Sequence, residues 1–139
     1  MNKIAIIFLL LITTNIFSEE LRLKCTNFKG YSIEYDNGKI GSFEDGFSGQ
    51  EIEFILPMPP QIGSPVTVNW TGRNMRNDQA FYIMSSKDGW GSFAQVSSNV
   101  LRTFAFFPKD AVMSMTETQT RMMLNSPQIR TFYSNCRVF

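Results

Sequence analysis

The sequence contains no histidine, and this absence limits the chemistry that the chain can perform. Ser-His-Asp and Cys-His catalysis both use an imidazole as the general base. The usual zinc sites also include histidine ligands. We therefore predict no catalytic residue, no metal ligand and no cofactor site.

Paired carboxylates could in principle hydrolyse glycosides, and the candidates are Glu44-Asp45 and the pair Glu51 and Glu53. Glu51 and Glu53 alternate with apolar residues, so we expect them on the solvated face of a half-buried strand. Asp36-Asn37-Gly38 supplies too few oxygen ligands for calcium. The sequence thus favours a binding protein over an enzyme.

Three residues are candidates for binding a partner. Trp90 lies between Gly89 and Gly91, and Arg73 and Arg76 belong to a polar segment predicted as a loop over residues 72–78. Tryptophan and arginine are enriched at binding hot spots. Each also has a structural alternative, since Trp90 could fold over the mouth of the protein as a plug.

The two cysteines, Cys25 and Cys136, are predicted to form a disulfide. An even cysteine count in an exported chain favours a disulfide, and neither residue belongs to a C-x-x-C motif. Closing so long a loop stabilises a fold by about 4–5 kcal/mol. Both cysteines fall on predicted inner strand faces, together with Leu21, Leu23, Phe132 and Val138. We expect a Cα separation of about 4.4–6.8 Å.

Residues 1–18 are typical of a secretory signal peptide. Lys3 precedes an apolar run over 4–12, and Ser18 is the expected cleavage position. The run is shorter than the roughly 20 residues that span a bilayer. We therefore predict one domain over 19–139, with a periplasmic or secreted location and no transmembrane span in the mature chain.

Loss of Lys3 leaves the Lys and Arg residues equal in number to the 12 Asp and Glu residues. A neutral domain has no general electrostatic attraction for nucleic acid or for anionic membranes. We predict an unknown protein or a small apolar ligand as the partner, and no nucleic acid.

Period-two alternation of apolar and polar residues dominates the mature chain and predicts strands. The Asn37-Gly38 dipeptide is typical of a hairpin turn. Further turns are expected at 45–49 and 57–65, and a helical turn at 120–125. The expected strands are 21–26, 31–35, 40–43, 52–56, 66–71, 80–84, 93–97, 100–107, 111–118 and 129–138.

These elements predict an all-β fold, an antiparallel up-and-down meander barrel or closed sandwich of about eight to ten strands. The disulfide would join the first strand to the last. Met113 and Met115 share a face and are expected in the core. The interior of such a barrel can be packed or can hold one small molecule, and the sequence leaves both open.

The layout of the mature chain resembles small lipocalin-like proteins exported by Gram-negative bacteria. The resemblance rests on Leu23-Lys24-Cys25, on Phe106-Phe107-Pro108-Lys109-Asp110-Ala111-Val112 and on Tyr133-Ser134-Asn135-Cys136-Arg137. The chain is also similar to periplasmic C-type lysozyme inhibitors, in which a loop with the motif Ser-Gly-x-x-Tyr enters the lysozyme cleft. Here Ser48-Gly49-Gln50-Glu51-Ile52 has isoleucine in place of that tyrosine, so no site residue is carried over.

Together these observations predict an exported, non-enzymatic β-barrel binding module of the cell envelope. A periplasmic protein like the lysozyme inhibitors, or a carrier of a small apolar ligand, is the alternative.

Overall fold

The computed structural model describes residues 19–36, 38–72, 75–85, 91–121 and 126–139. In these ranges the chain forms strands and turns, and it contains no helix long and apolar enough to cross a membrane. The strands are β1 (Glu20–Asp36), β2 (Lys39–Pro57), β3 (Pro65–Thr71), β4 (Arg76–Ser85), β5 (Gly91–Val96), β6 (Val100–Phe107), β7 (Val112–Arg121) and β8 (Ser126–Val138).

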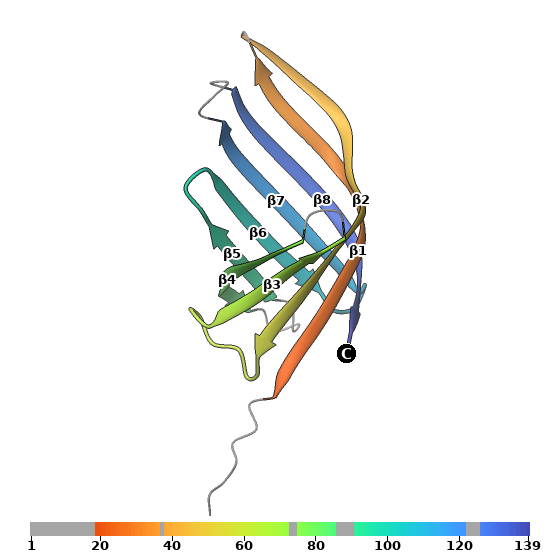
Figure 1. Cartoon of the computed structure of the whole chain (residues 1–139), viewed down its shortest axis with the longest axis vertical. Helices are drawn as coiled ribbons and strands as arrows, with labels where there is room; N and C mark the ends of the chain where they lie inside the picture. Colours follow the sequence, from red (N-terminus) through yellow and green to blue (C-terminus); the bar gives the residue numbers. More distant parts are fainter. Residues whose placement is uncertain (1–18, 37, 73–74, 86–90, 122–125) are drawn as a thin grey trace, which may run out of the picture.

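The eight strands form a closed antiparallel barrel in which each strand pairs with its sequence neighbours (Figure 1). β1 also pairs with β8, which closes the barrel. This arrangement confirms the predicted all-β meander barrel. Closure leaves no free sheet edge where the ring is complete, which is the usual protection of a β-protein against edge-to-edge aggregation.

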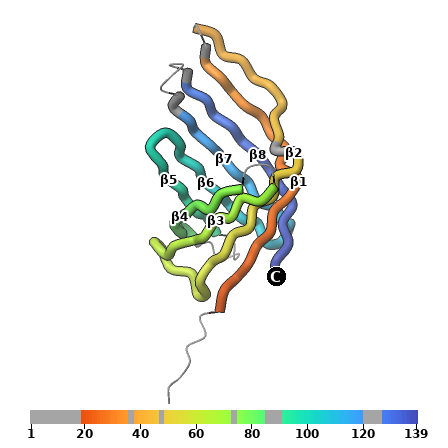
Figure 2. Tube along the Cα trace, in the orientation of Figure 1, coloured from red at the N-terminus to blue at the C-terminus, as the bar shows by residue number. Residues whose placement is uncertain are grey.

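The first two strands are much longer than predicted. β1 and β2 pair from Glu20 opposite Pro57 to Asp36 opposite Lys39, with one irregularity between Thr26 and Phe28. The hairpin at 37–38 is therefore confirmed. Its tip rises beyond the other strands (Figure 2).

The turn expected at 45–49 is wrong, because this segment lies inside β2. Gly46 stands opposite Lys29 in the β1–β2 ladder. Asn27, with φ 59°, lies at the irregularity in β1, and Gly49, with φ 71°, lies near it in β2. The turn-forming residues here make an irregularity in a two-stranded ribbon and do not end it, because β1 and β2 pair on both sides of 48–50.

Two other predictions need smaller corrections. The loop expected over 72–78 is shorter, because β4 already begins at Arg76. The expected helical turn at 120–125 is wrong at its start, since β7 continues to Arg121, and 122–125 lie outside the described residues. In both cases strand pairing with a neighbour extends the strand into a polar segment.

The core fills one half of the barrel interior with large apolar side chains. The Phe54 ring centroid lies 5.8 Å from that of Phe93 and 5.1 Å from that of Phe104. Met113 and Met115 are fully buried beside them, which confirms the predicted core position of both methionines. This half of the interior is packed.

The Cys25–Cys136 disulfide joins β1 to β8 and confirms the predicted pairing. The Cα atoms are 4.0 Å apart, closer than the predicted range. The Cys136 amide donates to the Ala111 carbonyl on the β7 side, 2.7 Å away. The two cysteines therefore form a non-hydrogen-bonded cross-strand pair, the type in which Cα atoms approach most closely.

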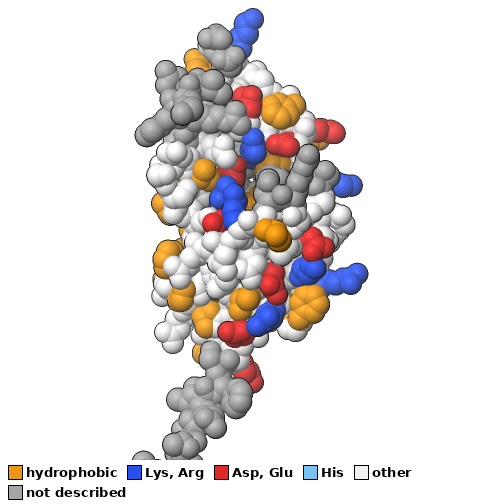
Figure 3. Space-filling view, viewed as in Figure 1, with side chains coloured by type: hydrophobic (Ala, Val, Ile, Leu, Met, Phe, Trp, Pro, Cys, Tyr) orange, Lys and Arg blue, Asp and Glu red, His pale blue; other side chains and the backbone are white. Residues whose placement is uncertain are grey.

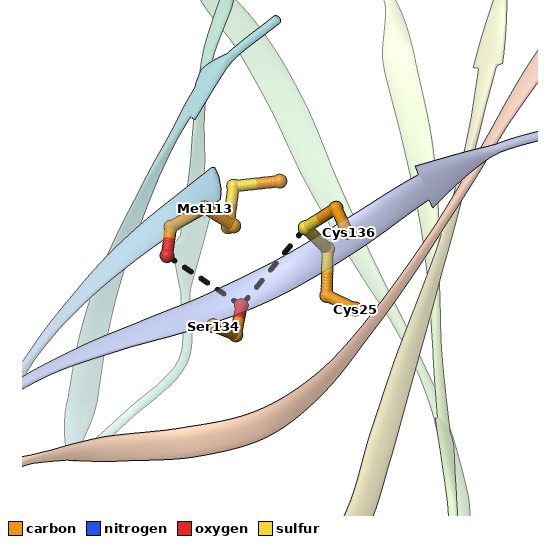
Figure 4. Close-up of a disulfide and its surroundings, with 4 residues drawn as sticks. All are labelled: Cys25, Met113, Ser134 and Cys136. Carbon is orange, nitrogen blue, oxygen red and sulfur yellow. Dashed lines mark hydrogen bonds between the residues drawn. A yellow bond between two sulfur atoms is a disulfide. The ribbon is translucent and has the colours of Figure 1, made fainter. Parts of the chain in front are cut away.

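Both sulfur atoms lie inside the barrel wall. The Ser134 hydroxyl lies 3.9 Å from Cys136 Sγ and 3.5 Å from the Met113 carbonyl oxygen (Figure 4). Cys25, Leu23 and Phe132 are buried, as predicted from the alternation. Val138, by contrast, is exposed at the end of β8, where the barrel wall stops.

Candidate functional site

Along three neighbouring strands, the inward-facing side chains change from apolar to polar. β6 has Phe104 and then Arg102 on its inner face, and β7 has Met115 and then Glu117. On β8, Arg130 lies two positions before Phe132 in the chain and continues the same inner face. The same strand geometry that buries the aromatic core therefore also directs charged side chains into the other half of the barrel.

These polar side chains line a cavity of about 150 Å³ in the barrel, which is open on one side. The volume is enough for several water molecules or one small polar molecule. Strands β2, β3, β4, β6, β7 and β8 contribute to its wall. The lining residues are Gln50, Trp70, Arg76, Arg102, Glu117, Gln119 and Arg130.

Glu117 is the central acceptor of the site, and its side chain is only 3% exposed. One carboxylate oxygen accepts a hydrogen bond from Arg102 Nε. The other accepts a hydrogen bond of 2.7 Å from the Gln119 amide. Arg102 also donates to the Gln95 side-chain oxygen at 3.3 Å. Burying this ion pair is tolerable because several hydrogen bonds surround it.

Arg76 and Arg102 both lie over the indole of Trp70. Their guanidinium carbons are 4.2 Å and 5.4 Å from the ring centroid, respectively. Both distances are within the range of cation–π attraction. The buried indole therefore supports two cations that would otherwise repel each other.

The pKa of Arg76 is lowered, mainly because the side chain is partly buried. The neighbouring Arg102 cation lowers this pKa further. Asp78, whose carboxylate lies 2.9 Å from Arg76 Nε, and Glu117 act in the opposite direction without restoring the ordinary value. Arginine nevertheless stays protonated at neutral pH.

Arg130 connects the cavity to the long hairpin. Its Nη1 lies 3.8 Å from a Glu117 oxygen, and its Nε lies 3.7 Å from an Asp45 oxygen. Asp45 also accepts a hydrogen bond of 2.6 Å from Ser32. The extension of β1 and β2 beyond the barrel thus provides a wall beside the cavity, and acidic and basic side chains lie near one another on the face shown in Figure 3.

The charge balance of the lining is unequal. Three guanidiniums face the cavity, and Glu117 is the one carboxylate among the lining residues that the structure describes. Asp78 and Asp45 approach Arg76 and Arg130 from outside the lining. The lining is therefore rich in guanidinium hydrogen-bond donors, each with a carboxylate near it, and such a wall suits a polar or anionic molecule.

Of the three predicted binding residues, Arg76 lies in this cavity wall. Arg73 and Trp90 lie outside the described residues. Arg76 is positioned by the start of β4, opposite Trp70 in the β3–β4 ladder. That register explains the stacking of the guanidinium on the indole.

Sequence reasoning missed the other charged members of the cavity, although the signal was present. Arg102 is in phase with Phe104 and Phe106, and Glu117 is in phase with Met113 and Met115. A charged residue that continues an apolar period-two face must point inward with that face.

The other candidates considered from the sequence lie elsewhere. Glu51 and Glu53 face outward, as predicted, and form ion pairs with Lys24 at 2.6 Å and with Arg22 at 3.9 Å. Residues 48–52, which resemble the inhibitor motif, lie within β2, and Ile52 is buried in the core. In the described part of the chain, no group of three or more acidic, cysteine or histidine residues could hold a metal ion.

Two larger hollows, of about 480 Å³ and 490 Å³, lie along the β1–β8 seam near Asn27 and Asn135. Half of their lining side chains are exposed. Neither lining contains a buried charged side chain, in contrast to Arg102 and Glu117 in the interior cavity, so we assign no ligand site to them. No family description, curated protein or solved structure matches this chain.

Proposed function

We propose that the protein is an exported, non-enzymatic binding module of the cell envelope, and that the polar cavity in the barrel is its ligand site. The supporting observation is the contrast between the two halves of the interior. One half is filled by aromatic and methionine side chains, whereas the other holds a cavity lined mainly by polar and charged groups, of which Arg102 and Glu117 are buried and hydrogen-bonded. Such a division is typical of a site whose few polar groups orient a small ligand.

The same contrast makes a polar ligand a better candidate than an apolar one. An apolar molecule in this cavity would cover Arg130, whose Nε makes no hydrogen bond to a described residue, without giving it an acceptor, and a buried unpaired donor is costly. The packed half offers it no alternative space, since Phe54, Phe93 and Phe104 contact one another there.

The non-enzymatic part of the proposal rests on the chemistry of Glu117. Both of its oxygens accept hydrogen bonds from protein groups, so the carboxylate holds Arg102 and Gln119 in place. A general base must instead reach a proton on a substrate. Turnover in a hydrolase screen that disappears in Glu117→Gln, with the variant still folded, would contradict this assignment.

The location is proposed from the disulfide and from residues 1–18, which lie outside the described residues. Structural disulfides persist in oxidising compartments. Cell fractionation should recover the protein in the periplasm or the medium, with its first residue near Glu19. Recovery of the reduced protein in the cytoplasm, with Met1 retained, would refute an exported protein.

The ligand site is tested on protein purified from its own host. Native mass spectrometry should show a small polar molecule retained by the folded protein, and a retained lipid would favour the apolar carrier instead. NMR titration of isotope-labelled protein with a mixture of small polar compounds should shift the amide signals of Gln50, Arg102 and Glu117. Shifts confined to the outer seam near Asn27 would place the ligand elsewhere.

A further inference from the structure

We propose that the cavity selects an oxyanion, a carboxylate or phosphate group of a small ligand, and that Arg130 and Arg76 hold it. This inference rests on the proposed function and deepens it, because it names the chemical class of the ligand. It is supported by a contrast in the cavity wall: the carboxylate of Glu117 is fully hydrogen-bonded, whereas the Nε donor of Arg130 has no acceptor among the described residues.

Glu117, the one carboxylate among the described lining residues, is already fully hydrogen-bonded. Glu117 accepts hydrogen bonds at both oxygens, from Arg102 and from Gln119. Arg102 in turn is held by Glu117 and Gln95, and its side chain is only 9% exposed. Arg102, Glu117 and Gln119 therefore form a fixed, hydrogen-bonded base to the cavity, in which both Glu117 oxygens already accept a hydrogen bond.

One donor in the cavity wall, by contrast, has no hydrogen-bond acceptor. Arg130 Nε is buried and makes no hydrogen bond to any residue that the structure describes. Its ion-pair distances to Glu117 and Asp45, 3.8 Å and 3.7 Å, exceed hydrogen-bonding length. A buried donor without an acceptor costs free energy, and an oxyanion in the adjacent cavity would supply that acceptor.

Arg76 adds a second donor group on the opposite strand pair. Its side chain is 42% exposed, and its guanidinium is fixed over Trp70 at 4.2 Å. Because the indole holds it in place, little side-chain freedom remains to be lost on binding. A planar guanidinium recognises carboxylate and phosphate oxygens with two parallel hydrogen bonds.

The cavity also limits the size of the anion. A volume of about 150 Å³ is well below that of sites for drug-sized ligands. We expect the charged group and a few further atoms of the ligand to enter, and any larger part to remain at the mouth.

The test is an NMR titration of the disulfide-bonded protein with sodium acetate, with inorganic phosphate and with acetamide. Acetamide is the neutral counterpart of acetate and has the same shape. We expect acetate, phosphate or both to shift the amide signals of Arg102, Glu117 and Gln119, and acetamide to leave them unchanged. Comparison of the two anions separates a carboxylate site from a phosphate site.

Arg130→Gln and Arg76→Gln should each weaken anion binding by roughly tenfold or more, the loss expected for a charge-assisted hydrogen bond. Arg22→Gln is the matched control, because it removes the same charge from an exposed position outside the barrel. It should change the affinity less than about twofold, since exposed charges interact weakly across solvent. If Arg130→Gln does not fold, the half-exposed Arg76 still provides the comparison.

Two outcomes would overturn the inference in distinguishable ways. Acetamide binding in the cavity as tightly as acetate, or equal affinities in Arg130→Gln, Arg76→Gln and Arg22→Gln, would leave a binding cavity that does not select anions. The absence of any cavity shift with all three compounds, together with no retained molecule in native mass spectrometry, would refute the proposed ligand site itself.

Discussion

Replacing Glu117 with glutamine should lower the free energy of unfolding, because it leaves the buried Arg102 without its charged partner. The substitution keeps the size of the side chain and removes its negative charge. Arg102, with 9% exposure, would then face a neutral amide in the barrel interior. Removing one partner of a buried ion pair typically lowers the free energy of unfolding by about 3–5 kcal/mol. Because glutamine keeps an oxygen that accepts a hydrogen bond, we expect a loss of about 3 kcal/mol.

The matched control is Glu51→Gln on the outside of the barrel. Glu51 pairs with Lys24 at 2.6 Å, but the two side chains are 39% and 43% exposed. Solvent screens such a pair, so its loss should cost about 1 kcal/mol or less. Urea unfolding of both variants measures the difference in the free energy of unfolding at the same change of charge.

A double-mutant cycle with Arg102→Gln then isolates the interaction. If the two charges stabilise each other, Arg102→Gln with Glu117→Gln should cost clearly less than the sum of the single losses. Equal losses in Glu117→Gln and Glu51→Gln, or strict additivity in the cycle, would refute our view of the cavity as a network of coupled charges.

The remaining predictions concern the barrel itself. Replacing Cys25 and Cys136 with serine should lower the free energy of unfolding by up to about 5 kcal/mol, given the separation of 111 residues, and wild-type protein unfolded with a reductant should lose a similar amount. Phe54→Ala should cost about 3–5 kcal/mol in the same denaturation assay, because it leaves a cavity among packed aromatic rings. Gly30→Ala should cost roughly 1–3 kcal/mol or more, since its Cβ would lie 1.8 Å from a β8 carbonyl oxygen, whereas Gly41→Ala, with nothing within 4 Å, should change thermal stability little. Similar melting temperatures for the two glycine variants would contradict the close approach of β1 and β8.

Much of the barrel can be predicted from the sequence because its period-two pattern is strong. The inward positions of Phe54, Phe104 and Met115 follow from alternation with polar neighbours. The disulfide follows from the cysteine count and from the inner faces on which both cysteines lie. These features depend on the alternation of apolar and polar residues and on the two cysteines, and both can be read directly from the sequence.

The continuous run of β2 through 45–49 could not be predicted in the same way. Its glycines favour a turn locally, and only the facing length of β1 makes a strand the better solution. Strand pairing is a non-local interaction, so turn propensity alone cannot reveal it.

The cavity was missed because its residues are far apart in the chain. Arg102 and Glu117 meet through the β6–β7 register, and Arg130 joins them from β8. Each lies on a recognisable inner face, but their convergence depends on strand order. Arg76 was chosen for its residue type, and its stacking on Trp70 follows from a register that the sequence does not display.

The disulfide also decides how the molecule would carry mechanical tension. A pull between Glu20 and Phe139 reaches Cys25 and Cys136 first, and their Cα atoms are 4.0 Å apart. Without that bond, unravelling the segment between the cysteines, which are 111 positions apart, would release a length of roughly 3.3–3.6 Å per residue. With it, the load crosses from one end strand to the other through a covalent bond. Every residue that lines the cavity lies between the two cysteines in the chain, so the cavity would stay unstrained while the termini are under load.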